Sequence, residues 1–185
     1  MDRPEFLRDM TLEAFADTIV PGNKRAPDDR AVAGASSEPG AVEAGALALF
    51  EMPATGITEA LDFYAENLNL YAEEFISERE LEPATTVPAF VSLTFDERTT
   101  LVRQLLDDTH EQRELWILLA LFSSMAFDIA PHLHTAEALA AGHPGLTTLG
   151  FRPPDPDGLW RSPAFSYRRQ LAQPHPNTTP SGSPA

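Results

Sequence analysis

Four of the five histidines lie between positions 110 and 143, and their side chains are the most conspicuous candidates for chemistry. A neutral imidazole can bind iron, zinc or copper, and it can act as a general base near neutral pH. Asp128 stands four residues before His132, a spacing that places both on one face of a continuous helix. One hypothesis is therefore a metal site at a helix end, formed by Asp128, His132, His134 and His143.

The same histidines also fit a structural role. Pro131 lies between Asp128 and His132 and can turn the backbone away from a helical path. The sequence has no Glu-x-x-His pair of the kind used by di-iron bundles, and no His-Glu-x-x-His motif of metalloproteases. The alternative hypothesis is that these histidines cap helices or form hydrogen bonds with loops.

Two further groups of polar residues are candidates for chemistry. The segment from Asp107 to Glu111 holds His110 beside acidic residues, which suits either a general base or a set of helix caps. Ser123 and Ser124 lack the Gly-x-Ser-x-Gly turn of a nucleophile, so close helix packing explains them better. The chain also lacks Gly-x-Gly-x-x-Gly and Walker motifs, so we expect no flavin or nucleotide cofactor on it.

The charge balance limits the partners. Thirteen basic and twenty-eight acidic residues give a formal net charge of -15, so we expect repulsion from nucleic acid and anionic membranes. Cysteine is absent, which excludes disulfides and thiolate metal ligands. The longest apolar run, Leu115 to Phe122, is too short for a membrane span, and MDRPEFLRDM has no signal-peptide or twin-arginine pattern. The sequence therefore predicts a cytoplasmic protein without a membrane span.

Helical periodicity supplies the elements that position these residues. Apolar side chains recur every three and four residues along most of the chain, and no useful stretch alternates with a period of two. Thr94 and Glu97 form a capping-box pattern, and the most apolar helix, 111–129, is expected at the centre. The pattern predicts an all-α, single-domain helical bundle, with helices at residues 11–20, 40–51, 58–80, 94–106, 111–129, 135–141 and 159–171.

The chain is predicted to contain a helical domain, 1–172, and a tail, 173–185, whose composition is typical of disorder. Residues 22–38 have almost no bulky side chains and are predicted to form a long flexible loop. Residues 140–160 are rich in glycine and proline and predict an irregular C-terminal segment. This segment either covers the bundle core or contacts a partner protein through Phe151, Arg152 and Trp160.

Four segments carry a family resemblance: TLEAFADTIVPG (11–22), PGAVEAGALALFE (39–51), FDERTTLVRQLLDD (95–108) and LGFRPP (149–154). In this order they resemble gluconate 2-dehydrogenase subunit 3. The resemblance implies a small helical subunit that associates with a flavin-bearing oxidoreductase of the glucose-methanol-choline type and is not itself catalytic. The family's twin-arginine signal is absent, and AEALAAGHPGLTT (136–148) replaces the usual aromatic, glycine-rich lead-in to the last motif. The resemblance therefore implies a cytoplasmic relative with its own task.

Three functions follow from these observations. The leading hypothesis is a non-catalytic small subunit or maturation partner of a flavin-dependent oxidoreductase, with the flavin on the partner subunit. The alternative is a stand-alone metal-assisted or cofactor-independent oxidoreductase that uses the histidine-rich segment 110–143. A third hypothesis is a homomeric structural protein.

Overall fold

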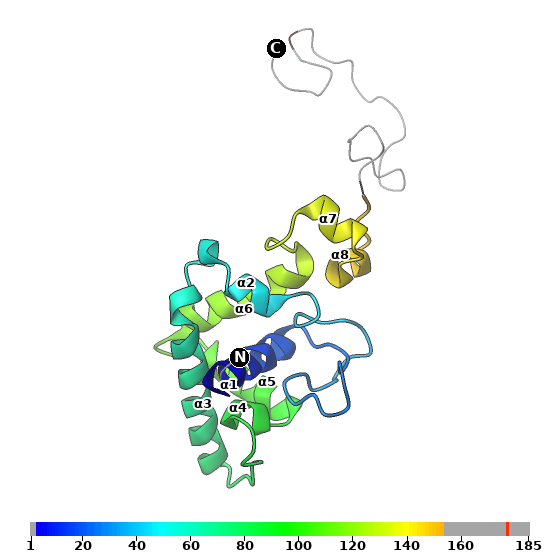
Figure 1. Cartoon of the computed structure of the whole chain (residues 1–185). Coiled ribbons are helices and arrows are strands. Elements are labelled where there is room, and N and C mark those ends of the chain that lie inside the picture. The colour runs from blue at the N-terminus through cyan, green and yellow to red at the C-terminus, as the bar shows by residue number, and fades with distance from the viewer. Residues whose placement is uncertain (1–2, 154–176, 178–185) are drawn as a thin grey trace. The chain divides into compact units, whose positions relative to one another are not determined.

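The computed structural model describes residues 3–153 and residue 177. These residues contain eight α-helices, two short 3-10 helices and no strand, so the predicted all-α class is confirmed (Figure 1). The predicted helix at 159–171 and the predicted tail, apart from Asn177, lie outside the described residues. The elements are α1 (Arg3–Ile19), α2 (Ala46–Phe50), η1 (Pro53–Thr55), η2 (Thr58–Ala60), α3 (Leu61–Glu78), α4 (Ala89–Ser92), α5 (Phe95–Leu105), α6 (Arg113–Asp128), α7 (Thr135–Ala140) and α8 (Pro144–Thr148).

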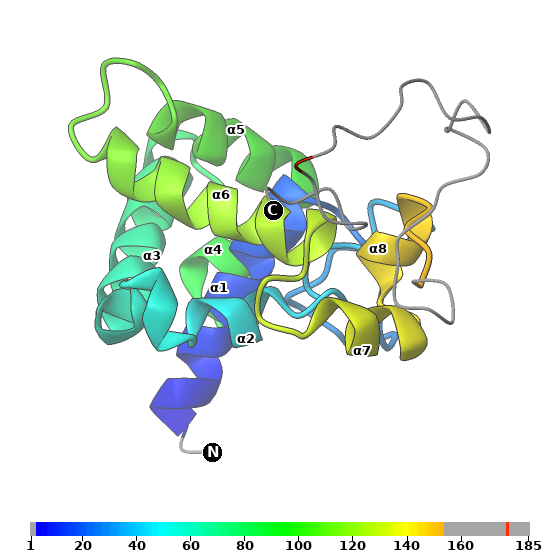
Figure 2. The same cartoon turned by 90° about the horizontal axis from the view of Figure 1, so that it is seen from above.

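Helix α1 is the element around which the bundle packs. It contacts five helices, α2 to α6, and Figure 2 shows it passing between them. Its small buried residues, such as Ala14 and Ala16, let neighbours approach from several sides. The sequence predicted that the helix at 111–129 would be central, but α6 buries one stripe and leaves Ile117 and Leu121 exposed on its outer face.

An aromatic cluster fastens α6 to α1 and α3. The Trp116 ring lies 6.1 Å from the ring of Phe15 on α1, and 5.9 Å and 6.0 Å from those of Tyr64 and Tyr71 on α3. The two tyrosines meet the indole edge-on, which is a favourable geometry for aromatic pairs. Trp116 is fully buried, so this cluster joins α6 to α1 and α3 in the interior of the bundle.

The predicted starts and ends of several helices are confirmed. Thr94 accepts a hydrogen bond from the Glu97 amide at 3.4 Å, and the Glu97 carboxylate accepts one from the Thr94 amide at 2.7 Å, which completes the capping box of α5. Helix α1 ends at Ile19, two residues before Pro21, as predicted, but it begins at Arg3 and not at the predicted residue 11. Helix α2 is shorter than predicted, because residues 41–45 form turns and Gly45 has a φ of 89°.

The last two helices form a small core of their own, made by Ala130, Ala138 and Leu146. Helix α8 contacts α6 and α7, so this part of the segment 140–160 is helical where the sequence predicted irregular backbone. Pro144 at the first helical position explains the difference, since proline favours helix starts as well as loops. Among the described helices, none is long and apolar enough to cross a lipid bilayer.

Candidate functional site

The loop at residues 22–38, called here the 22–38 loop, is closed at its base. The Asn23 amide donates to the Glu38 carbonyl at 2.9 Å, and the Ala41 amide donates to the Val20 carbonyl at 3.0 Å. Two Pro-Gly pairs meet at this point, and a Cβ atom on Gly40 would lie only 2.5 Å from the Val20 oxygen. A side chain there would separate the two ends, so glycine allows the chain to close into a compact Ω-like loop.

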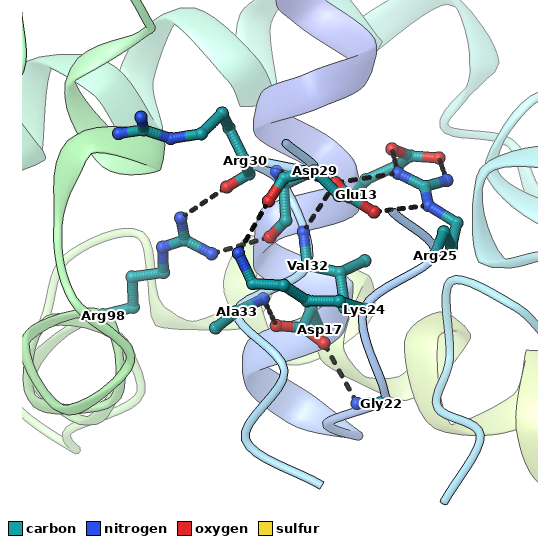
Figure 3. A network of polar contacts seen from close by, with 11 residues as sticks. Glu13, Asp17, Gly22, Lys24, Arg25, Asp29, Arg30, Val32, Ala33 and Arg98 are labelled. Carbon is teal, nitrogen blue, oxygen red and sulfur yellow. Dashed lines mark hydrogen bonds and ion pairs between the residues drawn. The ribbon is translucent and has the colours of Figure 1, made fainter. Parts of the chain in front are cut away.

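Asp17 fixes the loop from inside the bundle. It lies on α1 with a side chain that is 1% exposed, and its two carboxylate oxygens accept from the Gly22 amide at 3.0 Å and the Ala33 amide at 2.8 Å (Figure 3). Burial raises the pKa of Asp17, while these two hydrogen bonds and the charge of Arg98 act to lower it. The start and the second half of the loop are therefore bound to one buried carboxylate.

Arg98 holds the same loop from the opposite side. Its guanidinium, in a residue that is 2% exposed, donates to the carbonyls of Ala31 at 2.7 Å, Arg30 at 3.0 Å and Val91 at 2.7 Å. Burial lowers the pKa of Arg98 to about 10, so the group stays charged at neutral pH. Arg98 thus joins the loop to α5 and, through the Val91 carbonyl, to α4. Figure 3 shows its position beside Arg30 of the loop.

A third set of bonds joins the outer half of the loop to α1. Asp29 accepts from the amides of Ala31 at 3.1 Å and Val32 at 3.2 Å, and Arg25 donates to it at 2.7 Å. Arg25 also donates to both carboxylate oxygens of Glu13, at 2.7 Å and 2.6 Å. Burial acts to raise the pKa of Asp29, but these hydrogen bonds lower it overall. The hydrogen bonds to Glu13 and Asp29 raise the pKa of Arg25.

The prediction of a flexible loop rested on the scarcity of bulky side chains in residues 22–38. In the structure, hydrogen bonds between the loop backbone and charged side chains hold the loop instead, and the number of bulky residues gives no information about such bonds. A sequence signal for one anchor does exist. Arg98 shares a helix stripe with Leu101, Val102 and Leu105, and a charged residue on an apolar stripe needs buried partners.

The anchored loop forms one side of a groove with a volume of about 420 Å³. Phe6, Met10 and Glu13 of α1 line the opposite side, at helical spacing that places them on one face. Leu47 of α2 adds to the apolar lining, and loop residues from Arg25 to Ala31 supply most of the charged groups. We call this feature the α1 groove. Its size suits a ligand side chain or a short peptide segment.

The predicted metal residues are only partly brought together. The rings of His132 and His143 lie 6.2 Å apart, whereas Asp128 and His134 are exposed. Across the described part of the chain, no group of three or more histidine, aspartate or glutamate side chains is arranged to hold a metal ion. The structure therefore pairs two of the four predicted residues and does not gather the set.

His132 and His143, called here the histidine joint, connect the C-terminal helices to the turn before α2. His143 Nε2 lies 3.0 Å from the Ala44 carbonyl, and its Nδ1 accepts from the Leu146 amide at 3.3 Å, which caps α8. Because a carbonyl only accepts, the proton of a neutral His143 belongs on Nε2. His132 packs against Gly45, and its buried Nδ1 has no hydrogen-bond partner among the described residues. Burial, and then His143, lower the pKa of His132.

The polar cluster at residues 107–111 also has bonds of the capping kind. Asp107 accepts from the Thr109 amide at 3.0 Å, and His110 Nδ1 accepts from the Gln112 amide at 3.1 Å. The His110 ring also lies 5.2 Å from the ring of Tyr71. These contacts order the connection between α5 and α6, as the capping hypothesis predicts.

The predicted partner-binding residues lie at the end of the described chain. Phe151 is 47% exposed and Arg152 is also exposed, while Trp160 lies outside the described residues. Leu149, two residues before Phe151, is 53% exposed. Two large apolar side chains and an arginine thus follow α8 directly.

Comparison with protein families gives one match. The model of a family of unknown function, DUF5987, matches residues 7–185. Comparisons with curated proteins and with solved structures found no match. Because the family model covers nearly the whole sequence, this chain belongs to the DUF5987 family.

Proposed function

We propose that this chain is a non-catalytic small subunit or maturation partner of a flavin-dependent oxidoreductase of the glucose-methanol-choline type. In this proposal the flavin is bound by the partner, and this chain binds no cofactor. The ordered resemblance of four segments to gluconate 2-dehydrogenase subunit 3 supports the class of partner. The observation that carries the binding role is the pair of exposed apolar side chains after α8, Leu149 and Phe151, and the next residue in the sequence, Arg152, is also exposed. Aromatic and arginine side chains are enriched at protein interfaces.

The backbone presents Phe151 in a fixed position. The Phe151 amide donates to the Leu146 carbonyl at 2.9 Å, and the Gly150 amide donates to the Thr147 carbonyl at 3.0 Å. Gly150 has a φ of 79°, so the end of α8 forms a Schellman motif. A side chain on a backbone that is already ordered loses less conformational entropy when a partner binds. Phe151 therefore has the properties of a binding anchor.

The test is to purify the tagged chain from its native cells and to identify co-purifying proteins by mass spectrometry and bound flavin by absorbance. The affinity of the isolated pair is then measured for the wild type, Phe151→Ala and Leu70→Ala. Leu70 is a matched control, because it is an exposed apolar residue on α3, 56% accessible, in another part of the bundle. We expect Phe151→Ala to weaken binding by about 30-fold, as for a typical hot spot, and Leu70→Ala to have no effect.

Two results contradict the proposal. One is a chain that purifies without a flavoprotein, and the other is equal binding by the folded Phe151→Ala and wild-type proteins. Stoichiometric metal in the purified chain favours the alternative, a metal-assisted oxidoreductase. A cytoplasmic location belongs to the same proposal, and cell fractionation tests it.

A further inference from the structure

We propose that the α1 groove is a docking site for a partner segment that carries a large apolar side chain next to lysine or arginine. This site uses none of the residues after α8, so it does not depend on the identity of the proposed oxidoreductase partner. Three properties of the groove support this inference: a fixed wall, an unpartnered aromatic side chain and an excess of carboxylates.

The loop side of the groove is a preformed wall. Arg25 holds Glu13 and Asp29 together, and Asp29 in turn binds the amides of Ala31 and Val32. Arg98 binds the carbonyls of Arg30 and Ala31 in the same part of the loop (Figure 3). This wall is therefore already ordered in the folded protein. A segment that binds in the groove does not have to offset the conformational entropy of the loop, which favours binding.

The α1 side of the groove presents an aromatic ring to solvent. Phe6 is 50% exposed, and Met10 lies one turn further along the same face of α1. Leu47 of α2 borders the same space. A half-exposed phenylalanine beside a methionine and a leucine forms an apolar surface that a large side chain of a partner can cover.

The charges of the groove select a basic partner. Four carboxylates line it, those of Asp9, Glu13, Asp28 and Asp29, against two arginines, Arg25 and Arg30. Asp9 is already paired with Arg8, whose guanidinium lies 2.7 Å from its carboxylate. Arg25 is already used by Glu13 and Asp29, and Figure 3 draws the Arg30 guanidinium on the side of Arg98, away from the Glu13–Arg25 pair.

Asp28 is the carboxylate left over at this groove. It is exposed and has no hydrogen bond or ion pair with the described residues. The formal charge of the whole chain, -15, has the same sign and speeds the approach of a cationic segment. A lysine or arginine that pairs with Asp28 would also bring its neighbouring side chain next to Phe6 and Met10.

The test uses a synthetic amphipathic peptide of leucine and lysine, with a leucine–glutamate peptide of the same length as control. Binding is followed by calorimetry and by chemical shifts in NMR spectra of the full chain. We expect the lysine peptide to shift the signals of Met10, Ala31 and Leu47, and the glutamate peptide to shift none. Phe6→Ala should weaken binding by about tenfold or more.

Phe63→Ala is the matched control, because Phe63 is 43% exposed on α3 and lies outside the groove. It should bind the lysine peptide like the wild type. Asp28→Asn provides a second variant on an exposed side chain, and it should weaken binding and reduce its dependence on salt. The proposal is overturned by equal losses in Phe6→Ala and Phe63→Ala, by wild-type binding in Asp28→Asn, or by shifts spread over acidic surfaces away from the groove.

Discussion

The 22–38 loop and the histidine joint both attach irregular backbone to the bundle, but the side-chain groups that make the contacts differ. The loop is held by the ionised side chains of Asp17, Asp29 and Arg98, each of which makes two or three hydrogen bonds to backbone groups. The joint is held by two imidazole rings, and one ring nitrogen of His132 has no hydrogen-bond partner among the described residues. Hydrogen bonds to ionised groups are roughly twice as strong as neutral ones, and the loop backbone makes six of them to these charged side chains, so we expect the loop to be the more firmly held of the two.

The two regions also show that the type of a residue does not determine its role. Histidines are the residues most often used for metal binding and proton transfer, yet His143 here caps a short helix and binds a loop carbonyl. Arginine, alanine and aspartate residues of the loop, by contrast, form the wall of a groove because distant charged groups order their backbone. Substitutions should therefore have their largest effects at the loop anchors and their smallest at the histidine joint.

The largest effect is expected for Arg98→Met. Methionine keeps much of the apolar stem but leaves three carbonyls, two of them in buried bonds, without this donor, and Asp17 without its neighbouring positive charge. We expect the free energy of unfolding to fall by about 3 kcal/mol, as for other broken buried charge interactions. Urea denaturation measures it. The control is Arg103→Met on the exposed side of the same helix, which should change stability by less than about 0.5 kcal/mol. Similar losses of unfolding free energy in both variants would show that Arg98 does not anchor the loop.

A smaller effect is expected for Asp17→Asn. The amide keeps one acceptor oxygen but replaces the other with a donor, so the amide of Gly22 or Ala33 loses its partner. We expect a loss of about 1–2 kcal/mol, the usual penalty for an unsatisfied buried group. Hydrogen exchange at Gly22 and Ala33 should speed up in this variant. Unchanged exchange at both amides would mean that Asp17 does not hold the loop.

The smallest effect is expected at the histidine joint, and it depends on pH. The folded-state pKa of His132 lies below the ordinary value of 6.5, so the unfolded chain binds the proton more readily. The contribution of His132 to stability is therefore fully present above pH 6.5 and is lost as the pH falls toward the folded-state pKa.

Thermal unfolding between pH 7 and pH 5 tests this sign, with His132→Gln and His134→Gln as the pair of variants. The wild type and His134→Gln should lose stability more steeply on acidification than His132→Gln, because His134 is exposed. The raised pKa of Asp17 acts in the opposite direction, but it is common to all three proteins and cancels in the comparison. Parallel curves for the three proteins would show that His132 does not titrate on unfolding.

Local patterns predicted much of the fold. The capping box at Thr94, the stop at Pro21-Gly22 and the long stripe of α3 were each readable from neighbouring residues, and the structure confirms them. The anchors of the loop were not predictable in this way. Arg98 and the Ala31 carbonyl are separated by 67 positions, and His143 and Ala44 by 99, and no local pattern encodes which distant backbone group a charged or aromatic side chain will meet.

The central position of α1 was missed for a related physical reason. Its buried residues include Ala14, Ala16 and Thr18, which are too small to mark a core helix on a hydrophobicity scale. Small side chains nevertheless allow several helices to approach one axis closely. The more apolar α6 lies at the side of that axis, where it can leave Ile117 and Leu121 exposed.

Hydrogen–deuterium exchange of the full chain tests most directly the claim that the 22–38 loop is a fixed wall of the α1 groove. The amides of Gly22, Ala31, Val32 and Ala33 should exchange slowly, through openings that cost much of the free energy of global unfolding. The exposed segment 82–86 serves as the internal reference and should exchange rapidly. Exchange in the 22–38 loop as fast as in 82–86 would contradict the account.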